Sequence, residues 1–133
     1  SLNQSNERYI ESLEQGMSFI KISKDTWDHE FMNDHLMFPI AYACSAAQEN
    51  IILEDTLLSY LHSNLCNLLG AGVKLIPLGQ TEGQKIQLKL NSFIQKEYKN
   101  ILKKNINYIG NCGWFNDIVS MKHENQYTRI FRT

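Results

Sequence analysis

The sequence predicts an all-α protein, a compact multi-helix bundle of about six to seven helices that forms a single domain over residues 1–133. Two observations lead to this prediction. Apolar residues recur at three- and four-residue spacings through most of the chain, which is the period of an amphipathic helix. No segment shows the alternation of apolar and polar residues between turn signals that is typical of a strand, and the one candidate, Ile20 to Ile22, is short. The chain is also long enough to bury one hydrophobic core.

A first helix is predicted from Asn6 to about Ile22. Its apolar residues share one helix face: Tyr9, Ile10, Leu13, Met17 and Ile20. A short second helix is predicted over residues 25–31, because Asp25 and Thr26 are suitable N-caps and the apolar Trp27 and Phe31 are four residues apart.

Pro39 suits the first turn of a third helix, which is expected to end near Asn50. Its small residues let a neighbouring helix approach closely: Ala41, Ala43, Ala46 and Ala47. A fourth helix is predicted from Glu54 to about Val73, and a broad leucine stripe predicts that it is the central and most buried helix. Gly70 and Gly72 are expected to weaken its last turns.

A turn is predicted at residues 77–79, since proline does not continue a helix. Thr81 and Gln84 then have the spacing of a capping box, and this signature repeats at Ser92. The segment from Gln84 to Lys104 is therefore interpreted as two helices that meet near Asn91.

The remaining chain is predicted to contain a linker, a helix and a tail. Residues 105–113 are rich in Asn and Gly, which is typical of a linker. A last helix is expected at about 114–124, and a polar and aromatic tail at about 123–133. Because the chain opens with Ser1, the natural protein is expected to extend further upstream.

Composition argues against several classes of function. A formal net charge of −1 gives no overall positive field for nucleic acid. Apolar runs are too short to span a membrane. Cys44, Cys66 and Cys112 are far apart and odd in number, so neither a disulfide framework nor a zinc site is indicated, and a cytoplasmic location is predicted.

No motif for catalysis is present in the sequence. There is no nucleophile elbow, and the glycines of residues 70–72 end a leucine-rich helix instead of opening a phosphate-binding one. Four histidines lack metal-site spacing and are interpreted as structural or solvated: His29, His35, His62 and His123. The alternative that one surface histidine contributes to a weak metal site stays open. The prediction is a protein that is not an enzyme and has no metal site or cofactor of its own.

Lysines concentrate in the segment between residues 85 and 104. They are Lys85, Lys89, Lys96, Lys99, Lys103 and Lys104. A solvated outer helix face explains them most simply, and an electrostatic contact with an acidic partner protein is the sharper alternative. The leucine stripe of residues 54–73 has a similar alternative, because any part of it that stays exposed would form a homodimer interface.

Two segments carry more polar detail than a core requires. They are VKLIPLGQTEGQK at Val73 to Lys85 and SMKHENQYTRIFR at Ser120 to Arg132. Both closely resemble motifs of the UreF family of urease accessory proteins, whose members typically read RLVPLGQTDGQ and, at the chain's end, MRHETQYSRLFRS. Weaker similarity runs upstream through His35, and Cys66 replaces the serine of a Ser-Asn pair common in the family. The similarity covers essentially the whole chain and corresponds to about the C-terminal three-fifths of a family member.

This resemblance implies an all-α fold, commonly a homodimer, that binds the accessory protein UreD (UreH in some organisms) and recruits the GTPase UreG to the urease apoprotein. Nickel and GTP then belong to partner proteins. The resemblance, with the interface-prone chemistry of the two motifs, places the partner-binding residues at Lys74, Pro77, Gly79, Gln80, Gly83, Gln84, Lys85, His123, Glu124, Tyr127, Arg129, Ile130 and Phe131. Gly79 and Gly83 are expected to permit tight backbone geometry.

Several alternatives stay open at the level of sequence. The turn at residues 77–85 could simply cap its own helix, and Tyr127 and Phe131 could tuck against their own domain. The protein could instead regulate the partner GTPase, as an activator or a fidelity checkpoint, with Arg129 or Lys74 reaching toward the nucleotide. An unrelated helical adaptor would follow only if both motif matches were coincidental.

Overall fold

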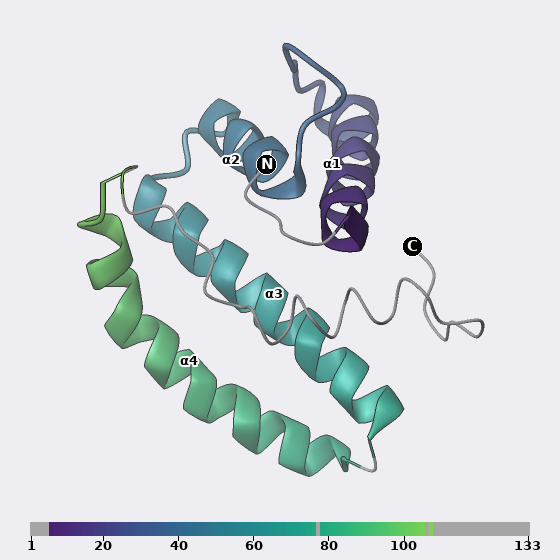
Figure 1. The fold of residues 1–133 in the computed structure, drawn as a ribbon. Coiled ribbons are helices and arrows are strands. Elements are labelled where there is room, and N and C mark those ends of the chain that lie inside the picture. The colour runs from purple at the N-terminus through teal and green to yellow at the C-terminus, as the bar shows by residue number, and fades with distance from the viewer. Residues whose placement is uncertain (1–5, 77, 106, 108–133) are drawn as a thin grey trace. The chain divides into compact units, whose positions relative to one another are not determined.

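The structure is a computed structural model that describes residues 6–76, 78–105 and 107 (Figure 1). The described residues form four α-helices and no strand: α1 (Asn6–Trp27), α2 (Phe38–Gln48), α3 (Leu53–Leu75) and α4 (Gln80–Leu102). The all-α prediction is confirmed. The helix predicted at 114–124 and the tail lie outside the described residues, so a total of six to seven helices stays a prediction.

The described helices form two compact units. In the first, within residues 6–49, α1 packs against α2; in the second, within residues 50–107, α3 packs against α4. Each unit is a pair of helices joined by a connecting segment. The single domain predicted over residues 1–133 stays a prediction.

The short helix predicted over residues 25–31 is wrong. Helix α1 continues through Asp25 and Thr26 to Trp27, so these two polar residues lie in its last turn and cap nothing. The helix ends because Asp28 adopts a left-handed backbone conformation with φ 55°. Residues 28–37 then form a non-helical connection to α2.

Helix α2 begins as the sequence predicts, with Pro39 in its first turn. It packs against α1, whose buried residues include Gly16 and Ile20, and its own buried residues include Ala41 and Ala46. These small residues allow the close approach that the alanine-rich sequence predicts. Aromatic side chains extend the contact, since the Phe19 ring lies 5.6 Å from the ring of Phe38 and 5.9 Å from that of Tyr42 between centroids.

Helices α3 and α4 form a helical hairpin, each 23 residues long. The prediction of two helices that meet near Asn91 is wrong, because α4 runs unbroken through Asn91. The Ser92 hydroxyl does not cap a helix; it donates to the carbonyl oxygen of Leu88, one turn earlier.

The prediction that α3 is the most buried helix is wrong for the described chain. No residue of α3 is fully buried, and its stripe of leucines is mostly half-buried. The physical reason is that a two-helix hairpin covers only one side of each helix. A leucine stripe records how much apolar surface a helix offers, and the neighbouring elements decide how much of it is covered.

Candidate functional site

The turn between α3 and α4 holds the predicted partner-binding residues that the structure describes. These are Lys74 at the end of α3, Gly79 before α4, and Gln80, Gly83, Gln84 and Lys85 in the first turns of α4. The structure therefore brings them together at one end of the hairpin. Pro77 and the predicted tail residues, from His123 to Phe131, lie outside the described residues.

Backbone hydrogen bonds define this turn. The Ile76 N–H donates to the carbonyl oxygen of Gly72 at 2.9 Å, which closes the last turn of α3. The Leu78 N–H donates to the carbonyl oxygen of Ile76 at 2.6 Å, and the Gly83 N–H donates to that of Gly79 at 3.0 Å. The chain thus reverses between the end of α3 and the start of α4 within a few residues, and this fixes where the neighbouring side chains lie.

The predicted capping box at Thr81 and Gln84 is wrong. The N-cap of α4 is Gly79, and no side chain caps this helix end. Thr81 lies in the first turn of α4 and Gln84 is its fifth residue, and both side chains are exposed. This absence of a side-chain cap argues against the alternative that the amide side chains of the turn serve only to cap their own helix.

The two glycines of the turn differ in what they contribute. Gly79 has φ −66°, a value open to any residue, and a Cβ there would meet no atom within 4 Å. Gly83 is buried, and a Cβ on it would lie 3.3 Å from Cγ2 of Val73. The expectation of tight geometry is therefore confirmed at Gly83, where α4 approaches α3 closely, and wrong at Gly79.

The surface of the turn mixes apolar and basic side chains. Leu75 and Ile76 are exposed, Ile76 to 61% of its surface, and exposed Lys74 precedes them. Lys85 pairs with Glu82 at 2.7 Å, and both side chains are mostly exposed, so the pair contributes little to stability. Exposed aliphatic residues beside a charged rim are typical of a surface that contacts another protein.

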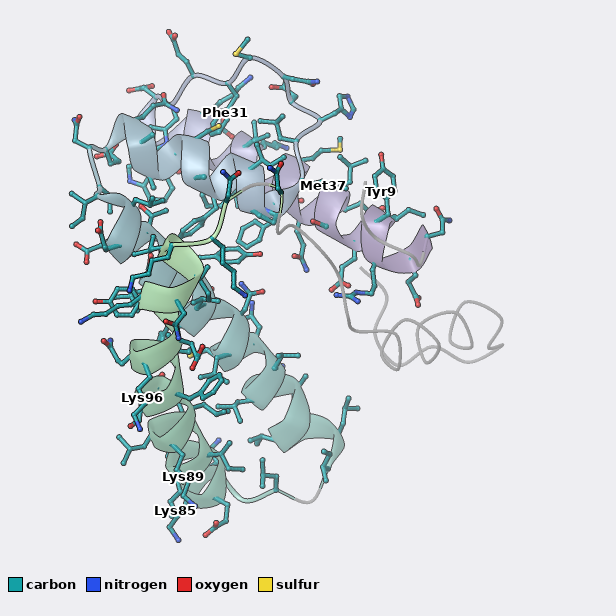
Figure 2. The ribbon with its side chains drawn as sticks, turned by 60° about the vertical axis from the view of Figure 1, so that its left-hand side comes forward. Tyr9, Phe31, Met37, Lys85, Lys89 and Lys96 are labelled. Carbon is teal, nitrogen blue, oxygen red and sulfur yellow. The ribbon has the colours of Figure 1, made fainter. Side chains whose placement is uncertain are left out.

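The lysines of α4 continue from the turn along the helix. Lys85, Lys89 and Lys96 are exposed and project from one side of α4 in Figure 2. Further along, the Lys99 ammonium lies 5.9 Å from the ring centroid of Tyr98. This exposure agrees with a solvated outer face and leaves the basic surface accessible to an acidic partner.

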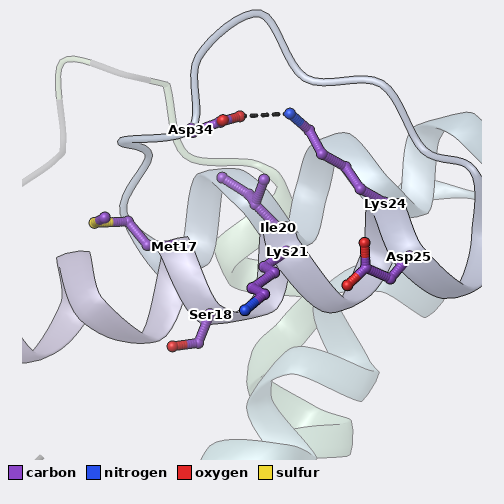
Figure 3. A pocket seen from close by; sticks show the side chains of 7 residues that line it. All are labelled: Met17, Ser18, Ile20, Lys21, Lys24, Asp25 and Asp34. Atoms are coloured by element: carbon purple, nitrogen blue, oxygen red, sulfur yellow. Dashed lines mark hydrogen bonds and ion pairs between the residues drawn. The ribbon is translucent and has the colours of Figure 1, made fainter.

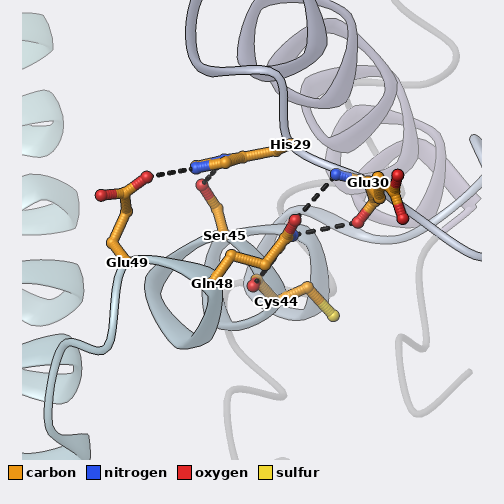
Figure 4. Close-up of polar contacts among 6 residues, drawn as sticks. All are labelled: His29, Glu30, Cys44, Ser45, Gln48 and Glu49. Atoms are coloured by element: carbon orange, nitrogen blue, oxygen red, sulfur yellow. Dashed lines mark hydrogen bonds and ion pairs between the residues drawn. The ribbon is translucent and has the colours of Figure 1, made fainter.

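The connection between α1 and α2 contains a polar cluster that the sequence did not reveal (Figure 4). The imidazole of His29 is buried, with Nε2 2.7 Å from Oε1 of Glu49 and Nδ1 2.7 Å from Oγ of Ser45. Since a carboxylate only accepts hydrogen bonds, Nε2 donates to Glu49; in a neutral imidazole Nδ1 then accepts from the Ser45 hydroxyl. Gln48 adds to this by accepting from the Glu30 N–H at 2.7 Å and donating to the Glu30 carbonyl oxygen at 3.0 Å.

This cluster has the residue types of a Ser-His-acid triad, but its placement indicates a structural role. Ser45 lies inside α2 and is buried, so its oxygen does not face solvent or a substrate. The hydrogen bonds instead hold the connection of residues 28–37 against α2. His29 is thus a structural histidine, as predicted, and sequence spacing gave no local signal for its distant partners.

A cavity of about 430 Å³ lies beside α1 (Figure 3). It is lined by Met17, Ser18, Ile20, Lys21, Lys24, Asp25 and Asp34. The Lys24 ammonium and the Asp34 carboxylate pair at 2.7 Å across it, and both are substantially exposed. In the described part of the chain, no group of three His, Cys, Asp or Glu side chains is placed to hold a metal ion. Among the described helices, none combines the length and the hydrophobicity that a membrane span requires.

Comparison with known proteins agrees with the motif at the turn. A sequence model of the UreF family matches residues 1–91, which include the whole α3–α4 turn. The chain belongs to the UreF family. Because this match covers most of the chain, the hypothesis of an unrelated helical adaptor is wrong.

Curated relatives of this UreF-family chain carry the name urease accessory protein UreF. The chain is 33% identical to the one from Bradyrhizobium diazoefficiens, over 97% of this chain and 56% of the relative. It is 36% identical to that of Ruegeria pomeroyi, over 97% of this chain and 58% of the relative. With the Trichormus variabilis protein it shares 43% identity over 72% of this chain and 42% of the relative. The chain spans about half the length of the curated relatives it matches.

Proposed function

We propose that this chain is a non-catalytic urease accessory protein that acts in the cytoplasm as a scaffold for nickel insertion. In this proposal it binds a partner of the UreD or UreH type and recruits the GTPase UreG to the urease apoprotein. Nickel and GTP are held by the partners, and the chain needs no cofactor. Membership of the UreF family and the relatives' name, urease accessory protein, support this assignment.

The observation that carries the proposal is the surface at the α3–α4 turn. Lys74, Ile76 and Gln80 are exposed in the segment that most closely resembles a family motif. None of them is needed to build the hairpin core, since the close contact there is made by Gly83 and Val73. Side chains that the fold does not require, gathered at one end of a rigid hairpin, are suited to binding another protein.

The tail supplies a second contact in this proposal. Tyr127, Arg129, Ile130 and Phe131 combine aromatic, aliphatic and guanidinium groups, the types enriched in interface hot spots. His123 and Glu124 begin the same motif. We assign the tail to the UreD-type partner and the turn to the GTPase, because the basic Lys74 and Lys85 suit an acidic protein surface.

A homodimer is the oligomeric state we propose. The hairpin exposes large apolar side chains, with Leu68 exposed to 73%, Leu88 to 71% and Phe93 to 59% of their surface. Surfaces of this kind are typical of protein contacts, and a two-fold dimer is the commonest way to cover them. Sedimentation of the full-length protein over a concentration series measures this directly.

A capture experiment with a matched control tests the proposed role of the turn. Full-length protein with Lys74, Gln80 and Gln84 all changed to Ala is expected to lose capture of the GTPase and keep capture of the UreD-type partner. The control changes Gln95 and Lys103 to Ala, which also removes exposed lysine and glutamine side chains from the hairpin. Gln95 lies roughly 16 Å along α4 from Gln84. Equal loss in both variants, or no loss in either, contradicts the proposal.

The second candidate function is regulation of the partner GTPase, and the exposed Lys74 is the observation that favours it. The rate of GTP hydrolysis by the GTPase separates the two functions. A scaffold leaves the rate unchanged when the full-length protein is added. An activator raises it, and Lys74→Ala then removes the increase.

A further inference from the structure

A cysteine and a histidine meet on the side of α3 that faces α4. His62 and Cys66 are four residues apart in α3, so they lie on the same helix face. The Cys66 Sγ is 3.4 Å from the His62 Nε2. Cys66 is half-buried and His62 is exposed, so the pair lies where solvent reaches it. This pair is separate from the α3–α4 turn and from the polar cluster around His29.

Two side chains of α4 hold the pair in place. The Asn91 Oδ1 lies 3.1 Å from the His62 Nδ1, and the Gln87 Nε2 donates to the Cys66 Sγ at 3.2 Å. Because an amide oxygen only accepts, Nδ1 carries the ring proton. In the neutral form of the ring, the lone pair of Nε2 is then on the side of the sulfur. Ligand histidines in metal sites are commonly oriented in this way, through the ring nitrogen that does not bind the metal.

The spacing of the two donor atoms matches the bite of a metal ion. Zinc binds histidine nitrogen at about 2.05 Å and cysteine sulfur at about 2.3 Å, so at a near-tetrahedral angle the two donors are roughly 3.5 Å apart. The 3.4 Å between His62 Nε2 and Cys66 Sγ is close to that value. The separation of the two donor atoms is therefore compatible with binding of one ion by both.

We propose that His62 and Cys66 form a site for one transition-metal ion of the borderline or soft class, with Asn91 and Gln87 as positioning residues. On binding, the Cys66 thiol releases its proton to solvent, and the thiolate and the imidazole each donate one electron pair to the ion. Among the described residues no third His, Cys, Asp or Glu joins the pair, so these residues supply two ligands to the ion.

The first test uses cobalt(II), a spectroscopic substitute for zinc, added to tag-free full-length protein. A thiolate-to-cobalt charge-transfer band in the near ultraviolet is expected, saturating at one ion per chain for this site. Cys66→Ser removes the band, and Cys44→Ser, which changes the other described cysteine, keeps it. Asn91→Leu, which leaves both ligands in place, weakens binding roughly tenfold. A band of unchanged strength in Cys66→Ser overturns the proposal.

A second measurement needs no variant and so does not depend on folding of the mutants. The alkylation rate of each cysteine is mapped by mass spectrometry in the wild-type protein, with and without zinc. Zinc is expected to slow alkylation of Cys66 and leave that of Cys44 unchanged. Equal alkylation rates of Cys66 with and without zinc overturn the proposal.

Discussion

Replacement of Gly16 by Ala tests how closely α1 approaches the chain that leads into α2. A Cβ at Gly16 would overlap the carbonyl oxygen of Leu36 and would lie 2.8 Å from the nitrogen of Phe38 and 2.9 Å from the carbonyl carbon of Met37. All three are backbone atoms, so no side-chain rotation relieves the clash. The first unit is therefore expected to tolerate only glycine at this position.

The expected magnitude follows from two opposing effects. Alanine favours a helix interior over glycine by about 1 kcal/mol, which stabilises the variant. Overpacking costs about 1 to 3 kcal/mol, and the upper end applies to Gly16 because the clash is with backbone. The net prediction for Gly16→Ala is a loss of about 2 kcal/mol in the free energy of unfolding.

The control is Gly70→Ala in α3, because a Cβ at Gly70 would meet no atom within 4 Å. Only helix propensity then acts, and Gly70→Ala is expected to stabilise the protein by about 0.5 to 1 kcal/mol. Urea unfolding followed by circular dichroism measures both variants against the wild type. A Gly16→Ala protein as stable as the wild type would refute the close approach of α1 to residues 36–38.

The remaining predictions concern the polar side chains of the two units. Ser45→Ala leaves the buried Nδ1 of His29 without its donor and is expected to lower the free energy of unfolding by about 1 to 3 kcal/mol in thermal melts; an unchanged melting temperature would contradict this. Thr81→Ala is expected to change stability by less than about 0.5 kcal/mol, because Thr81 is not a cap; a loss near 1 kcal/mol in urea unfolding would restore the capping box. Glu82→Gln removes the exposed ion pair with Lys85 and is expected to lower the free energy of unfolding by less than about 1 kcal/mol. A larger loss in urea unfolding would contradict the small contribution expected of this exposed pair.

Periodicity predicted the helical class and the start of most helices, because apolar spacing and proline placement act locally. Pro39 opens α2, and the segment from Glu54 to Val73 lies within α3, as predicted. The predictions were wrong where a local capping signal was outweighed by continuation of the helix. The residues of segment 25–31 suit a cap, but α1 continues through Asp25 until the left-handed Asp28 stops it. Across Asn91, uninterrupted packing of α4 on α3 outweighed a second capping signature.

The candidate site was predictable only in part for a similar reason. The turn motif drew attention to Lys74 and Gly83, and the structure places both at one end of the hairpin. Partners that are distant in sequence left no pattern. His29 lies 20 residues from Glu49, and Asn91 lies 29 from His62, so only folding brings these pairs together. The turn motif is contiguous in the sequence and could therefore be found there, whereas the polar pairs join distant residues and are seen only in the structure.

The most direct test of the scaffold assignment is co-purification of the full-length protein with the UreD-type partner and the GTPase. The intact chain is compared with one truncated before Tyr127. Our account predicts that the intact chain captures both partners and that truncation removes the UreD-type partner. Capture of neither partner by the intact chain would contradict the assignment, and capture of both by the truncated chain would contradict the role given to the tail.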